Sequence, residues 1–157
     1  MNEKYAPAPS LEVSDWLNTD TPLVLSELLG KVVVLHAFQM LCPGCVTHGI
    51  PQANSIYQTF DDSELQVIGL HTVFEHHEVM TKEALTVFVH EYKLQFPIGI
   101  DLASESGAIP RTMNKYQLQG TPSLVLIDQC GAIRLKHLGQ LSDMQLGNAI
   151  GRLLAGG

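Results

Sequence analysis

The chain has 157 residues, of which 45% are hydrophobic and 16% charged, and its formal net charge is −7 at pH 7. This length fits a single domain with a sizeable core, so we expect residues 1–157 to form one domain. The negative charge argues against nucleic-acid and anionic-membrane partners. No stretch is apolar over the length that a bilayer-spanning helix needs.

Residues 1–10 are proline-rich, and we expect an extended lead-in to the domain. They contain no apolar core of a secretory signal, so we expect a cytoplasmic protein if Met1 is the native start. A chain whose leader had been removed would look the same. Three cysteines are too few for a disulfide-stapled scaffold.

Hydrophobic patterning predicts the elements of the first half of the chain. Residues 23–25 are a short strand candidate, and residues 26–30 indicate one helical turn ended by Gly30. Residues 32–35 form an apolar run typical of a strand buried on both faces of a sheet. Helical spacing follows from Val46 to Phe60.

The second half of the chain continues to alternate between predicted strands and predicted helices. We predict a strand over 65–70, a helix over 81–92, a strand over 96–100 and a helix from about Pro110 to before Gly120. Two apolar runs over 122–128 and 132–137 indicate a hairpin, and a helix over 142–154 has Ser142 as its N-cap. This order predicts an α/β fold with a central sheet of mixed direction and helices on both faces.

Cys42-Pro43-Gly44-Cys45 lies where the buried strand gives way to a helix. A helix N-terminus offers unpaired backbone N–H groups and the positive end of a dipole, which favour a thiolate over a thiol. Pro43 suits the first helical turn because it has no N–H to leave unpaired. Two intervening residues bring the sulfurs close enough to form or release a disulfide, so we interpret the motif as a redox site.

Metal binding is the alternative interpretation of these cysteines. A closed zinc site needs four ligands, and the chain offers one C-x-x-C pair and a distant Cys130. The strand-to-helix context favours redox chemistry. His71, His76 and His77 form a second candidate metal group, but adjacent histidines in a polar loop usually point apart. We expect no metal and no cofactor.

LHAFQMLCPGC resembles the active-site strand and turn of thioredoxin-fold proteins, and Gly120-Thr121-Pro122-Ser123 is similar to their cis-proline segment. With the lead-in LSELLGKVVVL, residues 11–154 most resemble the TlpA/ResA-like branch, next to the redoxin and AhpC/TSA relatives. The resemblance implies a thioredoxin-like fold, a three-layer sandwich with a central mixed sheet. It also implies that Pro122 is cis and that Thr121 and Pro122 bind an extended substrate.

We assign Cys42 as the attacking nucleophile because it stands at the mouth of the turn, and Cys45 as the resolving thiol. His36 and His48 occupy positions where relatives carry acidic or amide side chains, so each is a possible proton acceptor. The alternatives are a neutral core histidine and a surface histidine. Pro51 comes one residue later than the helix-kinking proline of the family.

The resemblance implies a thiol-disulfide oxidoreductase. Pro43 and Gly44, between the cysteines, carry no charge and no histidine, so we expect the site to work in the reducing direction. Its partners would be a protein or small-molecule disulfide and an electron-donating reductant, with no nucleic acid and no membrane. One alternative is an AhpC/TSA-type thiol peroxidase, but Gln39 and Leu35 stand where that family has its threonine and proline. The other is a non-enzymatic metal chaperone of the same fold.

Overall fold

Six strands form one mixed sheet in the computed structural model, which describes residues 4–157. The strands are β1 (Val13–Leu17), β2 (Val32–Phe38), β3 (Leu65–His71), β4 (Ile98–Asp101), β5 (Ser123–Ile127) and β6 (Ile133–Leu138). The helices are α1 (Ile50–Thr59), α2 (Lys82–Glu91), α3 (Arg111–Lys115) and α4 (Asp143–Leu154). The first three residues of the expected lead-in lie outside the described residues.

The sheet order is β1-β4-β3-β2-β5-β6, with β2 in the middle. β2 runs parallel to β3 and antiparallel to β5, and β3 runs parallel to β4. β1 and β6 are antiparallel edge strands. All seven residues of β2 are buried, because helices cover both faces of a central strand.

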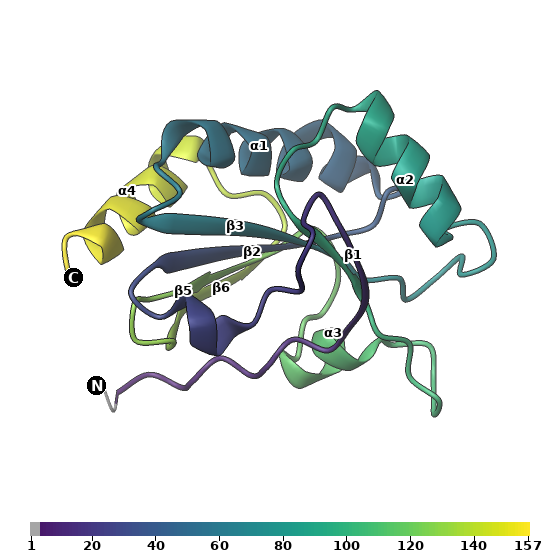
Figure 1. Ribbon diagram of the computed structural model, residues 1–157, viewed down its shortest axis with the longest axis horizontal. Coiled ribbons are helices and arrows are strands. Elements are labelled where there is room, and N and C mark those ends of the chain that lie inside the picture. Colours follow the sequence, from purple (N-terminus) through teal and green to yellow (C-terminus); the bar gives the residue numbers. More distant parts are fainter. Residues whose placement is uncertain (1–3) are drawn as a thin grey trace.

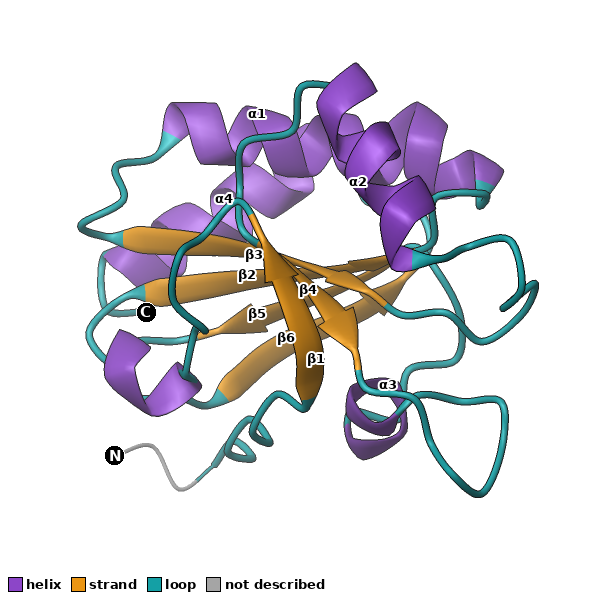
Figure 2. Ribbon diagram, turned by 45° about the vertical axis from the view of Figure 1, so that its right-hand side comes forward, coloured by secondary structure: helices purple, strands orange, loops and turns teal. Residues whose placement is uncertain are grey.

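Helices lie on both sides of the sheet, as predicted (Figures 1 and 2). Val34 and Phe38 of β2 pack with α1, α2 and α4, whereas Val33 and Leu35 pack with α3 and the 3₁₀ turn Leu25–Leu28. Successive side chains of a strand point to opposite faces, so β2 supplies both cores. The expected three-layer sandwich is confirmed. None of the helices within residues 4–157 is long and apolar enough to cross a bilayer.

The first predicted strand, over residues 23–25, is wrong. Leu25 begins the 3₁₀ turn, and Gly30 ends the segment with a φ of +94°. The turn is amphipathic, and Leu25 and Leu28 pack on the core of one face. The edge strand β1 was not predicted; it pairs with β4, more than 80 residues away, and such pairing leaves no local signal.

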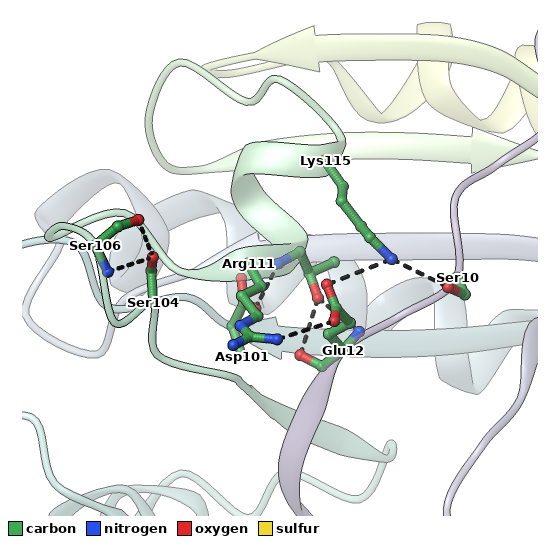
Figure 3. A network of polar contacts seen from close by, with 8 residues as sticks. Ser10, Glu12, Asp101, Ser104, Ser106, Arg111 and Lys115 are labelled. Carbon is green, nitrogen blue, oxygen red and sulfur yellow. Dashed lines mark hydrogen bonds and ion pairs between the residues drawn. The ribbon is translucent and has the colours of Figure 1, made fainter.

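A polar network fixes the five-residue helix α3 to β4 and to the N-terminal segment (Figure 3). The buried Asp101 carboxylate accepts hydrogen bonds from Thr112 N (2.8 Å), Met113 N (2.9 Å) and Thr72 Oγ1 (3.0 Å). A carboxylate at a helix N-terminus satisfies N–H groups that have no partner within the helix. We conclude that α3 is held in place by Asp101, although it is too short to be stable by itself.

Ion pairs join the same helix to Glu12, just after the lead-in, and a hydrogen bond joins it to Ser10. Glu12 lies 3.5 Å from Arg111 and 3.3 Å from Lys115, and Lys115 donates to Ser10 (3.2 Å), as Figure 3 shows. These pairs are partly exposed, so each contributes at most about 1 kcal/mol. The lead-in also bonds to the hairpin of β5 and β6, where Ala8 N donates to Gly131 O (2.9 Å).

Candidate active site

Cys42 directly precedes the helix that begins at residue 43 and continues into α1. Its sulfur accepts a hydrogen bond from Cys45 N (3.4 Å) and lies 3.5 Å from Thr121 O. The first of these contacts is the arrangement of a helix N-cap, with sulfur in place of the usual oxygen. A thiolate there gains from the N–H group and from the helix dipole, and Cys42 is only half-buried, so substrate can reach it.

Cys45 lies one turn further along and has no exposed surface. Burial, and then its hydrogen bond with Cys42, raises the pKa of the Cys45 thiol to about 12. Cys45 therefore keeps its proton near neutral pH in the reduced protein. The two thiols differ in the way that the sequence predicted, with an accessible first sulfur and a buried second one.

A π-helical turn, Cys45–Gly49, follows the cysteines, and Ile50 N bonds back to Cys45 O. Pro51 comes next, and a proline inside a regular α-helix lacks the N–H and clashes with the carbonyl four residues before it. The wider π turn takes up one extra residue and relieves that clash. The extra residue of the π turn matches the one-residue shift of Pro51 from the position that the resemblance implied.

Thr121-Pro122 is a cis peptide, as expected from the resemblance. Pro122 packs against the active-site helix: a Cβ built on Gly44 would lie 3.4 Å from Pro122 Cδ, and one built on Gly49 would lie 3.1 Å from Pro122 Cβ. The two landmarks of the sequence, far apart along the chain, are therefore neighbours. Pro122 O accepts from Gly139 N (2.8 Å), which anchors the segment to the residue after β6.

His36 is buried in β2, on the sheet face that also packs against Cys45. Burial, and then repulsion from His48, lowers the pKa of His36 from 6.5 to about 4, so the ring is neutral at pH 7. Its Nε2 is buried without a hydrogen-bond partner. No hydrogen bond joins His36 to Cys45 among the described residues; Nε2 faces Gly49 instead.

Within residues 4–157, no hydrogen bond joins the other histidines to either sulfur. His48 is half-buried, and its Nε2 is 3.1 Å from Leu141 O in the loop before α4. His71 is the buried end of β3, where its Nε2 accepts from Met40 N (3.1 Å). Burial lowers the pKa of His71 to about 4. His71 therefore does not join His76 and His77 in a loop, and residues 4–157 contain no group of three or more metal-binding side chains.

Gln39 is a residue of the site whose structural role was not predicted from the sequence. It is 1% exposed, its carbonyl accepts from Cys42 N (3.1 Å), and its side-chain Oε1 accepts from Phe74 N (3.1 Å). Gln39 thus links the active-site turn to the loop after β3. A large polar side chain directly after a wholly buried strand was the signal that could have revealed it.

The comparisons with known proteins agree with this geometry. The model of the AhpC/TSA family matches residues 5–136. The chain is 52% identical to a crystal structure of a thioredoxin-like superfamily protein, with a TM-score of 0.92 over 94% of this chain and 96% of that one. It is also 52% identical to a thiol-disulfide isomerase from Corynebacterium glutamicum, with a TM-score of 0.90 over 94% of this chain and 97% of that one.

Curated relatives are more distant. The chain is 27% identical over 139 residues to the thiol-disulfide oxidoreductase ResA of Bacillus cereus, a match that covers 88% of this chain and 72% of ResA. It is 30% identical over 141 residues to the protein DipZ of Mycobacterium bovis, but that match spans only 19% of DipZ. By its family match, its fold neighbours and its ResA relatives, the chain belongs to the AhpC/TSA family, within the TlpA/ResA-like branch of thioredoxin-fold proteins.

Proposed function

We propose that the chain is a thiol-disulfide oxidoreductase that reduces disulfides through Cys42 and Cys45. The Cys42 thiolate attacks one sulfur of a substrate disulfide, forms a mixed disulfide and releases the first substrate thiol. Cys45 then attacks the Cys42 sulfur, which releases the second thiol and leaves a Cys42–Cys45 disulfide. Two electrons pass to the substrate, and an external dithiol or reductase must return them.

The observation that carries this proposal is the unequal placement of the two sulfurs. Cys42 is accessible and accepts the Cys45 N–H at a helix N-terminus, whereas Cys45 is sealed behind it. An accessible sulfur can attack a bulky substrate, and a buried one can attack only the mixed disulfide that forms beside it. Thr121 and Pro122, next to Cys42, are the proposed binding edge for an extended substrate segment.

The resolving step requires a base, because the Cys45 pKa lies near 12. His36 and His48 remain the candidates. His36 is favoured because its ring is neutral, its Nε2 has no partner, and it lies on the sheet face against which Cys45 packs. His48 is directed to Leu141 O.

Peroxidase chemistry is less well supported. Leu35 is buried in the core on the α3 side of the sheet, and the Gln39 side chain is engaged with the loop at Phe74. Neither side chain carries a hydroxyl that could bind a peroxide at Cys42, and both are engaged elsewhere. A metal chaperone is also less well supported, because Cys42 and Cys45 would have to hold the ion without a third side chain of the described residues.

Reduction of insulin disulfides, with and without a thioredoxin-reductase system, tests the proposal. Turnover should depend on both cysteines, and the Cys42–Cys45 reduction potential should lie near that of thioredoxin, about −270 mV. Cys42→Ser should abolish exchange, and Cys45→Ser should accumulate mixed disulfides with substrate. Cys130→Ser is the matched control, because Cys130 is exposed in the turn after β5, and it should change neither result. Full activity of Cys42→Ser would overturn the assignment.

A further inference from the structure

A pocket of about 340 Å³ is lined by Phe74, which follows β3, and by residues of the segment 109–119, which ends two residues before Thr121. Phe74 lines one side of it, and the backbone N–H of Phe74 is bonded to Gln39, whose carbonyl holds Cys42 N. Gln119 lines another side and precedes by two residues Thr121, whose carbonyl touches the Cys42 sulfur. Two residues span at most about 7 Å, so the pocket opens within reach of a chain bound at Cys42.

The lining of this pocket is uncharged, and its accessible surface is polar and apolar in about equal parts. Met113 and Leu118 are 3% and 7% exposed and form the base, and Phe74 is half-buried. Ile109 is 50% exposed and stands at the rim. The remaining lining residues carry carboxamides: Asn114, Gln117 and Gln119. A charged group would find no counter-charge among these side chains and would lose hydration on entering.

The wall formed by α3 is rigid. Asp101 holds the N-terminus of α3 through Thr112 N and Met113 N. At the other end, Gln117 adopts a left-handed conformation with a φ of +53°, and Leu118 N bonds back to Met113 O (3.1 Å). This is the pattern of a Schellman C-cap, which brings residues such as Leu118 and Met113 into apolar contact. The base of the pocket is therefore formed before any substrate arrives.

We propose that this pocket selects the substrate by receiving an uncharged, apolar side chain about two residues from the reacting cysteine of a polypeptide disulfide. The inference rests on the proposed function and names its substrate class. The volume is at the lower end of the range of about 300–1,000 Å³ for ligand pockets, which suits one side chain. The net charge of −7 further disfavours acidic substrates.

The reduced protein tests this selection with three peptides that differ at one position, two residues from a cysteine. The residue is Leu, Asp or Lys, and the cysteine is disulfide-linked to nitrothiobenzoate, whose release is coloured. Each rate is divided by the rate with bis(2-hydroxyethyl) disulfide, which is too small to reach both the sulfur and the pocket. The Leu peptide should exceed the Asp peptide by about tenfold or more in kcat/KM, mainly through KM.

Ile109→Asp places a charge at the rim of the pocket and should reverse the preference. The Leu peptide should lose about tenfold in relative kcat/KM, and the Lys peptide should gain. Val87→Asp is the matched control: Val87 is 60% exposed on α2, away from the pocket, and its change should alter no ratio.

The outcomes separate the two proposals. Absence of turnover with bis(2-hydroxyethyl) disulfide would overturn the oxidoreductase function itself. Turnover of that disulfide with equal kcat/KM for the three peptides would overturn the pocket assignment alone. A preference for Leu that survives in Ile109→Asp would place the selective surface elsewhere and would also overturn it.

Discussion

His36 stands so close to Gly49 that a Cβ built on the glycine would lie 2.5 Å from His36 Cε1 and 2.9 Å from His36 Nε2. The imidazole cannot easily move, because it is buried and stacks on Phe38 with ring centroids 5.9 Å apart. A Cβ built on Gly49 would also lie 3.1 Å from Pro122 Cβ. The histidine of β2, the π-helical turn and the cis-proline segment are therefore packed around a residue that must lack a side chain.

Gly49→Ala should lower the free energy of unfolding by about 1–3 kcal/mol, because the methyl group overpacks a rigid core position. Urea denaturation measures the change. The matched control is Gly147→Ala in the interior of α4, where a Cβ would meet nothing within 4 Å. That variant should gain about 0.5–1 kcal/mol from the better helix propensity of alanine. A Gly49→Ala protein as stable as Gly147→Ala would contradict the close packing.

Stability should fall as the pH drops from about 6.5 towards 4. The pKa of His71 is 6.5 ordinarily and about 4 when buried, so in this window the unfolded chain binds a proton that the folded chain lacks. The same holds for His36. Each histidine can contribute up to about 1.4 kcal/mol per pH unit to the loss.

His71→Gln isolates one of these contributions. The glutamine carbonyl can still accept the Met40 N–H but cannot titrate, so the slope of unfolding free energy against pH should become shallower by up to about 1.4 kcal/mol per unit. His90→Gln is the control, because the His90 side chain is 86% exposed. Identical slopes for the His71 variant and its parent would show that this ring titrates normally.

Several features were predictable because their signals are local. The all-buried β2 follows from its apolar run, and the start of α4 follows from Ser142, which forms a capping box with Gln145. Cys42 and Pro122 were found from two short motifs. The features that were not predicted depend on residues distant in sequence. Strand β1 forms by pairing with β4. His71 is buried because β3 extends one residue beyond its predicted end.

The π-helical turn is the clearest example of a feature that hydrophobic spacing could not predict. Hydrophobic spacing from Val46 onward indicated a regular helix, and the structure has one residue too many in that turn. The position of Pro51 was the only signal, and it marked a departure without specifying its form. A π turn became evident only when Ile50 N was seen to bond to Cys45 O.

Reduced protein should reduce insulin disulfides far faster than hydrogen peroxide. Removing a single positioned hydrogen-bond donor costs about 10²–10³ in rate, and Gln39 stands where the family's peroxidases carry theirs. Peroxide consumption should therefore be at least about 100-fold slower than that of a peroxidase of the family. The measurement is peroxide consumption under single-turnover conditions, with Cys42→Ser as the blank. Rapid, Cys42-dependent consumption of peroxide would contradict the assignment.

Resolution of the mixed disulfide requires removal of the Cys45 proton. With a thiol pKa of about 12, Cys45 must give up its proton as it attacks the mixed disulfide. The buried His36 ring is neutral across the physiological range, and its Nε2 has no hydrogen-bond partner, so it can take the proton transiently although a pKa of about 4 makes it a weak base. Asparagine has a similar polarity but cannot act as a base.

His36→Asn should therefore slow the resolving step by about 100-fold, the lower end of what general bases contribute, and leave the first attack by Cys42 nearly unchanged. Stopped-flow measurement of both steps from about pH 5 to pH 9 separates them, since only the resolving step needs the Cys45 proton. His48→Asn is the comparison: its ring is held at Leu141 O, so the variant should resolve at the rate of the parent. Equal resolving rates for His36→Asn and the parent would make His36 a packing residue, and slow resolution in His48→Asn alone would transfer the role to His48.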